Sequence, residues 1–224
     1  MRFSPSCHPL AQQKKLLASY CIDTILDVGA NTGQFARQLR KDLAYKGRIV
    51  SFEPINAAFR ELEKNASGDP DWSVFNCAMG DSLDEIEINI AGNSTSSSCL
   101  DMLSAHLDAA PASGYVGKEL VSVKTVDSIF DEICGPSDKI CLKIDTQGFE
   151  EKVIKGALGS LPRIKLIQME MSLVPLYRDE MTFDQMYNYM VGLGFMLIGV
   201  EPGFADIKSG RLLQLDGIFE NVRA

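Results

Sequence analysis

The chain has 224 residues, of which 46% are hydrophobic and 23% charged, with a formal net charge of −8. This length fits one large α/β domain or two small ones, and it can bury a core without disulfides or a structural metal. The negative charge disfavours a non-specific nucleic-acid or membrane-surface binder, because both need basic patches.

The six cysteines are irregularly spaced and include no C-x-x-C pair, so we interpret them as reduced core residues. No apolar run reaches transmembrane length, and the N-terminus lacks the features of a cleavable signal peptide. We therefore expect a cytoplasmic protein without a membrane span.

Hydrophobic periodicity predicts an amphipathic N-terminal helix followed by a β-α-β-α-β unit. The helix covers about 9–20 within an N-terminal segment 1–20, and the three strands cover 22–28, 48–53 and 72–77. One helix begins after Gly33 and the other covers 56–65. This order is typical of a parallel, doubly wound sheet.

The alternation of predicted strands and helices is interrupted between residues 81 and 130. Residues 85–90 alternate with period two and predict a strand with one solvated face, and 120–124 predict another strand. The serine-rich stretch 92–98 between them reads either as a polar lip over a cofactor or as a solvated turn. We interpret 81–130 as a small antiparallel insertion that covers the acceptor side.

The alternation of strands and helices then resumes. Strands are predicted at 139–145, 164–170, 195–200 and 212–219, and helices at 150–158 and 183–193. The last two strands should pair antiparallel, because the loop between them is too short for a crossover helix. The whole chain, 1–224, should form one domain. Its strand plan resembles the class I methyltransferase fold, a Rossmann-like seven-stranded sheet with an antiparallel last strand and helices on both faces.

The loop after the first strand is the most informative segment. Glycines there let the backbone turn sharply and approach a ligand, and the following helix offers free N–H groups. The pattern Asp27-x-Gly29-x-Asn31-x-Gly33 differs from the G-x-G-x-x-G of dinucleotide-binding folds. Asp27 would repel a pyrophosphate and suits the α-ammonium group of a methionine moiety.

Glu53 ends the second predicted strand. A carboxylate at this place can accept hydrogen bonds from ribose hydroxyls, in nicotinamide and adenosyl cofactors alike. Only its combination with Asp27 and the glycine loop favours an adenosyl cofactor.

The chain resembles the FkbM-type methyltransferases in five motifs that keep their expected order. They are DVGANTGQF (27–35), FEP (52–54), TVDS (125–128), LKIDTQGFE (142–150) and VIKGA (153–157). Many members of the family carry Glu where Gln147 stands, and a Gln variant is also usual.

The resemblance implies O-methylation, with S-adenosylmethionine as donor, of a hydroxyl on a sugar, glycan or polyketide-like small molecule. It also implies a cofactor site, in which the loop after the first strand wraps the methionine end, Glu53 holds the ribose and the residues after the third strand lie near adenine. The expected cofactor-binding residues are Asp27, Gly29, Ala30, Asn31, Gly33, Glu53, Pro54, Ala78 and Met79.

Three residues are candidates for the acceptor side. Asp145 and Glu170 end neighbouring predicted strands and should face the ligand cleft. Asp145 reads either as a general base or Mg²⁺ ligand, or as an N-cap of the next helix. Glu170 reads either as a partner in catalysis and Mg²⁺ binding, or as half of a salt bridge with Lys143. His106 in the insertion is either a base or a surface residue.

Two other functions remain open at this point. A nicotinamide-dependent oxidoreductase shares the fold and the acid after the second strand, but Asp27 argues against it. A non-catalytic S-adenosylmethionine-binding protein is compatible with every motif. The acceptor's identity and the oligomeric state are not readable from the sequence.

Overall fold

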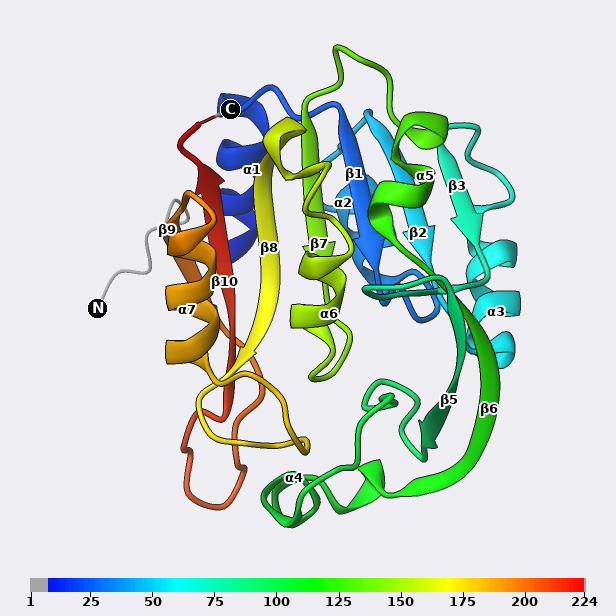
Figure 1. The fold of residues 1–224 in the computed structure, drawn as a ribbon, viewed down its shortest axis with the longest axis vertical. Helices are drawn as coiled ribbons and strands as arrows, with labels where there is room; N and C mark the ends of the chain where they lie inside the picture. The colour runs from blue at the N-terminus through cyan, green and yellow to red at the C-terminus, as the bar shows by residue number, and fades with distance from the viewer. Residues whose placement is uncertain (1–7, 224) are drawn as a thin grey trace.

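The computed structural model describes residues 8–223 and is built on a seven-stranded sheet with the order β3-β2-β1-β7-β8-β10-β9 (Figure 1). The strands are β1 (Thr24–Val28), β2 (Arg48–Phe52), β3 (Trp72–Phe75), β7 (Ile140–Ile144), β8 (Ile164–Ser172), β9 (Phe195–Pro202) and β10 (Gln214–Asn221). The first five in space are parallel, and β10 runs antiparallel to both β8 and β9. The predicted sheet, with its antiparallel C-terminal pair, is confirmed.

Helices cover both faces of this sheet (Figure 1). One face carries α1 (Pro9–Ser19), α2 (Gln34–Lys41) and α3 (Asn56–Ala66), and the other carries α5 (Val126–Ile133), α6 (Glu150–Lys155) and α7 (Phe183–Gly192). Each helix buries an apolar stripe, such as Leu39 of α2 and Leu62 of α3, both 0% exposed. A fully buried leucine contributes about 1.5–3 kcal/mol to stability, so this packing fixes the strand ends that carry the polar residues.

A second sheet lies beyond the carboxyl ends of the parallel strands (Figure 1). It has the order β4-β6-β5, from β4 (Ala78–Met79), β5 (Asp84–Ala91) and β6 (Tyr115–Lys124), and the short helix α4 (Ser104–Ala109) lies between β5 and β6. β5 and β6 pair antiparallel, whereas β4 and β6 pair parallel.

The helix α5 begins inside the stretch that we interpreted as the insertion, so the second sheet ends at Lys124 rather than near residue 130. The Thr125 side chain caps this helix by accepting from the Ser128 backbone N–H. The sequence analysis missed α4 and β4, which are too short to show a clear period, and it also missed α5, although Val126, Ile129, Phe130 and Ile133 have helical spacing. The α5 helix instead belongs to the crossover from β6 to β7.

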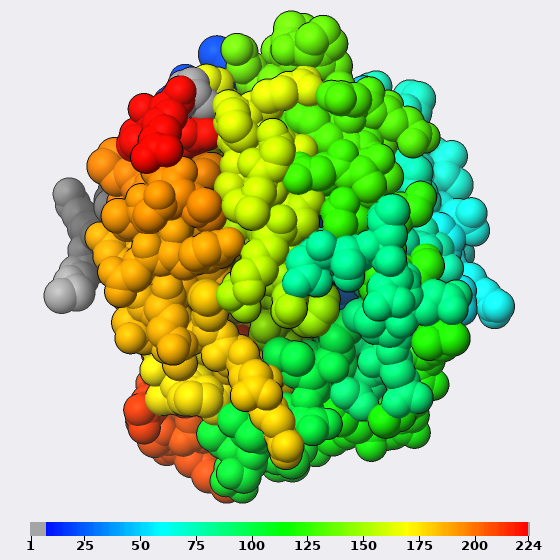
Figure 2. Space-filling view, in the orientation of Figure 1, coloured from blue at the N-terminus to red at the C-terminus, as the bar shows by residue number. Residues whose placement is uncertain are grey.

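The segment after β5 also touches the loop that follows β8. Leu103 N donates to Leu176 O at 2.8 Å, and Arg178 N donates to Asp101 O at 2.8 Å. Figure 2 shows this contact near the bottom of the molecule, where the green and yellow-orange segments meet. Of the helices in residues 8–223, none is both long and apolar enough to cross a membrane.

Candidate active site

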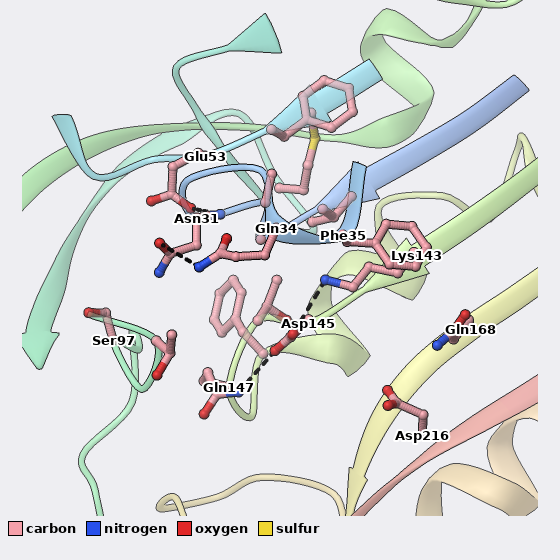
Figure 3. Close-up of a pocket in the computed structure, with 18 of the residues that line it drawn as sticks. Asn31, Gln34, Phe35, Glu53, Ser97, Lys143, Asp145, Gln147, Gln168 and Asp216 are labelled. Carbon is pink, nitrogen blue, oxygen red and sulfur yellow. Dashed lines mark hydrogen bonds and ion pairs between the residues drawn. The ribbon is translucent and has the colours of Figure 1, made fainter. Parts of the chain in front are cut away.

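A cavity of about 660 Å³ opens at the carboxyl ends of the parallel strands, where open α/β sheets bind ligands. This volume is within the range of small-molecule sites, roughly 300–1,000 Å³. Figure 3 shows one end marked by Glu53 and Asn31, the other by Gln168 and Asp216, with Lys143 and Asp145 between them.

The loop after β1 passes close to the end of β7. Gly29 has φ +77°, and a Cβ at this position would lie 1.8 Å from the carbonyl oxygen of Asp145. Asn31 also has a positive φ, 48°, which asparagine tolerates better than most residues. Its backbone N–H donates to Glu53 Oε2 at 2.8 Å, and its side chain donates to the Ser94 carbonyl at 3.2 Å.

Two residues expected at the methionine end of the cofactor do not reach the cavity. Asp27 is 0% exposed and its Oδ2 accepts one hydrogen bond from the Ser51 hydroxyl at 3.2 Å, while Lys143 Nζ lies 3.4 Å from its Oδ1. Burial raises the pKa of Asp27, against the opposing effect of Lys143. Gly33 is needed for packing, because a Cβ there would lie 2.7 Å from the Trp72 ring.

The other expected cofactor residues do line the cavity. Glu53 is 5% exposed, and its Oε1 accepts from the Ile55 N–H at 2.8 Å. Burial raises the pKa of Glu53 to about 7, although the two backbone hydrogen bonds act in the opposite direction. The remaining predicted residues on the wall are Gly29, Ala30, Asn31, Pro54, Ala78 and Met79.

The serine-rich loop closes over the same end of the cavity. Ser94, Thr95 and Ser97 belong to its wall, together with apolar side chains from the main sheet and the second sheet. The apolar members are Phe52, Ile55, Cys77, Ile88 and Cys99. An apolar slot beside a buried carboxylate is chemically suited to a purine with an attached ribose.

Lys143 lies at the centre of the site, between two carboxylates. Its Nζ is 3.4 Å from Asp27 Oδ1 and 3.3 Å from Asp145 Oδ2, and it lies 5.4 Å from the centre of the Phe35 ring. Burial alone would lower the pKa of Lys143, but Asp145 and Asp27 outweigh it and hold the pKa above its usual value. Lys143 therefore pairs with these two residues and not with Glu170.

Asp145 faces the cavity, and its side chain is 38% exposed. It does not cap the following helix: α6 begins at Glu150, preceded by Phe149, without a side-chain cap. Instead, Gln147 Nε2 donates to Asp145 Oδ1 at 2.9 Å and to Glu170 Oε2 at 2.6 Å. Gln147 has a left-handed backbone with φ 56°.

Gln147 is itself held from the other side. Its Oε1 accepts from the Tyr177 hydroxyl at 2.7 Å, and its backbone carbonyl accepts from the Ser98 hydroxyl at 2.6 Å. The side-chain amide is thus fixed by Tyr177 from the loop after β8, and the backbone of Gln147 by Ser98 from the segment between β5 and β6. Sequence reasoning missed its role, because a glutamine in a turn gives no distinctive signal.

Glu170 does not line the cavity. Its Oε2 also accepts from Gln214 Nε2 at 2.9 Å, and burial beside Asp145 and Glu150 raises its pKa well above the usual value. The Gln147 amide stands between Glu170 and Asp145, where a shared ion would have to bind. Within residues 8–223, no group of three His, Cys, Asp or Glu side chains is arranged to hold a metal, so the geometry does not fit the reading in which Asp145 and Glu170 share Mg²⁺.

His106 lies away from the cavity and is 2% exposed. Its ring packs against Tyr177 and Phe204, with ring centres 5.2 and 5.1 Å apart, and burial lowers its pKa. The structure therefore gives His106 a packing environment and neither of the two predicted settings, a base at the acceptor or a surface residue.

The far end of the cavity contains polar residues that sequence reasoning did not single out. Gln168 of β8, Glu201 of β9 and Asp216 of β10 all belong to the wall. The available signal was a polar side chain within a mainly apolar strand. It was ambiguous, because β9 is the edge strand of the sheet and β10 is next to it, and solvated polar residues are common near a sheet edge.

The architecture is that of a class I methyltransferase. Among solved structures, the chain resembles an FkbM methyltransferase from Methylobacillus flagellatus KT (TM-score 0.54, 15% identity), covering 88% of this chain and 43% of that one. An rRNA methylase from Streptococcus thermophilus gives TM-score 0.52 at 10% identity, with 97% and 99% covered. TrmK of M. capricolum, in complex with S-adenosyl-homocysteine, gives 0.51 at 8%, with 100% and 70% covered.

These identities are low, so the solved structures show the fold alone. This chain spans less than half of the Methylobacillus protein, and no curated protein matches it. The profile described as the Methyltransferase FkbM domain matches residues 27–197. The chain therefore belongs to the FkbM methyltransferase family, as its motifs predicted.

Proposed function

We propose that the protein methylates a hydroxyl group of a small polar acceptor, such as a sugar, glycan or polyketide-like molecule, with S-adenosylmethionine as donor. When bound, the donor supplies a methyl group that is already activated by a positively charged sulfur. The protein therefore mainly has to align acceptor and donor, and such positioning can account for about 7–11 kcal/mol of the barrier.

The cofactor would lie along the wall between β2 and β7. Glu53 would accept hydrogen bonds from the ribose hydroxyls, with Pro54, Ala78 and Met79 around the adenosine. Gly29, Ala30 and Asn31 would follow the methionine chain. Asp27 and Gly33 would contribute from behind the wall, one by holding Lys143 and the other by letting the loop pack against Trp72.

Asp145 is the residue we propose as general base. It is the carboxylate at the middle of the cavity, oriented by Lys143 and Gln147. When the acceptor hydroxyl is methylated it loses its proton, and Asp145 would take that proton. A placed base typically contributes about 10²–10⁴-fold.

The acidity of the cavity favours a small molecule over RNA as acceptor. Glu53, Asp145, Glu201 and Asp216 line it, against the single buried cation Lys143. Carboxylates attract a sulfonium and repel phosphates, and the net charge of −8 gives no sign of the basic surface that RNA binding uses.

The placement of Asp145 and Glu53 on the wall of one cavity, with Asp145 held by Lys143 and Gln147, is the observation that carries this proposal. The test is transfer of labelled methyl from S-adenosylmethionine to a panel of sugars and hydroxylated polyketides, with wild type and Asp145→Asn. Wild type should label at least one hydroxyl and the variant should not. Binding of S-adenosyl-homocysteine without transfer to any acceptor would favour the non-catalytic alternative.

A further inference from the structure

Four acidic residues form a row across neighbouring strands at the carboxyl edge of the main sheet. Asp216 of β10 pairs in register with Glu170 of β8 on one side and with Glu201 of β9 on the other. Asp145 follows β7 directly, and the register of β7 and β8 places it next to Glu170. Paired residues on adjacent strands point to the same face, about 5 Å apart.

The four carboxylates are not equally satisfied. Asp145 has Lys143 and Gln147, and Glu170 has Gln147 and Gln214. By contrast, neither Asp216 nor Glu201 has an ion pair or side-chain hydrogen bond with any residue in 8–223. Oε1 of Glu201 is fully buried without a donor there. Burying a carboxylate oxygen without a donor is costly, so Glu201 lacks a partner that carries N–H or O–H groups, and the half-buried Asp216 beside it is open to the same partner.

Gln168 gives a separate indication that a ligand belongs at this place. It is only 8% exposed, and it lines the cavity from β8. Its Oε1 accepts from Gln13 Nε2 at 3.2 Å, which fixes the amide. The Gln168 amide nitrogen then has no acceptor among the described side chains and points to a ligand with a lone pair, such as a hydroxyl oxygen (Figure 3).

We propose that this far end of the cavity is the acceptor subsite, an inference that rests on the proposed function. The subsite takes an acceptor with a protonated amine beside a hydroxyl, as in an amino sugar. The ammonium group binds between Asp216 and Glu201, and Gln168 donates to a neighbouring oxygen. The reacting hydroxyl then lies toward Asp145, at the middle of the cavity. An N-acetylated acceptor has no positive charge to offer the two carboxylates. Its amide nitrogen also carries one N–H donor, whereas an ammonium group carries three.

The charges agree with this choice of ligand. Burial, with Asp145 nearby, raises the pKa of Asp216 to about 6, and burial also raises the pKa of Glu201. An ammonium group placed between them would oppose both shifts, in the same sense as Lys143 acts on Asp216 and His8 on Glu201. A metal ion fits less well, since no three ligand side chains of the described chain converge there.

The test uses ligand-observed NMR on the full chain saturated with S-adenosyl-homocysteine, at pH 7. The probes are D-glucosamine, D-galactosamine and D-mannosamine, each compared with its N-acetylated form. We expect at least one amino sugar to bind wild type and its N-acetylated form not to bind. Asp216→Asn and Glu201→Gln should each weaken binding by at least about tenfold. Glu63→Gln, which removes an exposed charge on α3, is the matched control and should bind like wild type.

Three results would overturn the inference: no amino sugar binds, the N-acetylated forms bind equally well, or Asp216→Asn binds as wild type does. Calorimetry with S-adenosylmethionine on the same samples separates the two proposals. Failure of the cofactor to bind wild type contradicts the proposed function itself. A loss of cofactor affinity in Asp216→Asn that equals the loss of amino-sugar affinity would assign the two carboxylates to the cofactor's own ammonium group.

Discussion

Lys143 Nζ lies 3.3 Å from Asp145 Oδ2, so the carboxylate at the middle of the cavity rests against a buried cation. The same ammonium group reaches Asp27 on its other side. This arrangement orients Asp145 while leaving part of its surface open to an acceptor.

The first prediction concerns Asp145 as base. Asp145→Asn preserves the shape and the bond from Gln147 but cannot take a proton. It should lower kcat by about 10²–10⁴-fold while the calorimetric affinity for S-adenosyl-homocysteine stays within a few-fold of wild type. An unchanged kcat would remove Asp145 from the proton transfer.

A second prediction concerns Lys143 as the partner of a buried acid. Lys143→Met leaves Asp27 buried without a cation, which should lower the free energy of unfolding by about 3–5 kcal/mol. Urea denaturation measures the loss. Adding Asp27→Asn should recover much of it, because the uncompensated charge is then gone. A double variant as unstable as the sum of the two single variants would contradict this pairing.

The third prediction is a pH dependence set by Glu53. Because its pKa is raised to about 7, the carboxyl is largely protonated at pH 6 and ionised at pH 8. The ionised form accepts hydrogen bonds from both ribose hydroxyls, so affinity for S-adenosyl-homocysteine should rise between these two values. Calorimetry should show the rise in wild type and a flat profile in Glu53→Gln. The same slope in both would place the titrating group elsewhere.

Gly33 gives a prediction about stability. In Gly33→Ala the new Cβ meets the Trp72 ring at 2.7 Å, at a residue whose φ of +84° disfavours alanine. Overpacking of this kind costs about 1–3 kcal/mol, which thermal unfolding should detect as a lower Tm. Cofactor affinity at low temperature should stay near the wild-type value, since Gly33 does not line the cavity.

The fifth prediction is that His106, unlike Asp145, takes no part in catalysis. Since it packs between Tyr177 and Phe204 away from the cavity, His106→Leu should keep kcat within a few-fold of wild type from pH 6 to 8. A steady-state pH profile measures this. A loss comparable to that of Asp145→Asn in a folded protein would return His106 to the reaction.

Much of the fold could be predicted because hydrophobic periodicity marks long elements, such as the strands β1, β7 and β8. Glu53 could be located because the end of a strand has a defined place in this fold. Asp27 was misjudged: its position in the loop motif does not reveal that its side chain turns under Lys143. Asp216 and Glu201 were missed because their meeting at the sheet edge depends on a pairing register, which no local sequence pattern encodes.

The central claim, that this cavity holds the methyl donor with Asp145 facing the reacting centre, is tested most directly by a crystal structure with S-adenosyl-homocysteine. We expect the ribose hydroxyls within hydrogen-bond distance of Glu53 and the homocysteine sulfur on the side of Asp145, with the Gln168 and Asp216 end still open. A product molecule bound outside this cavity, or lying with its adenosine against Asp216, would contradict the account.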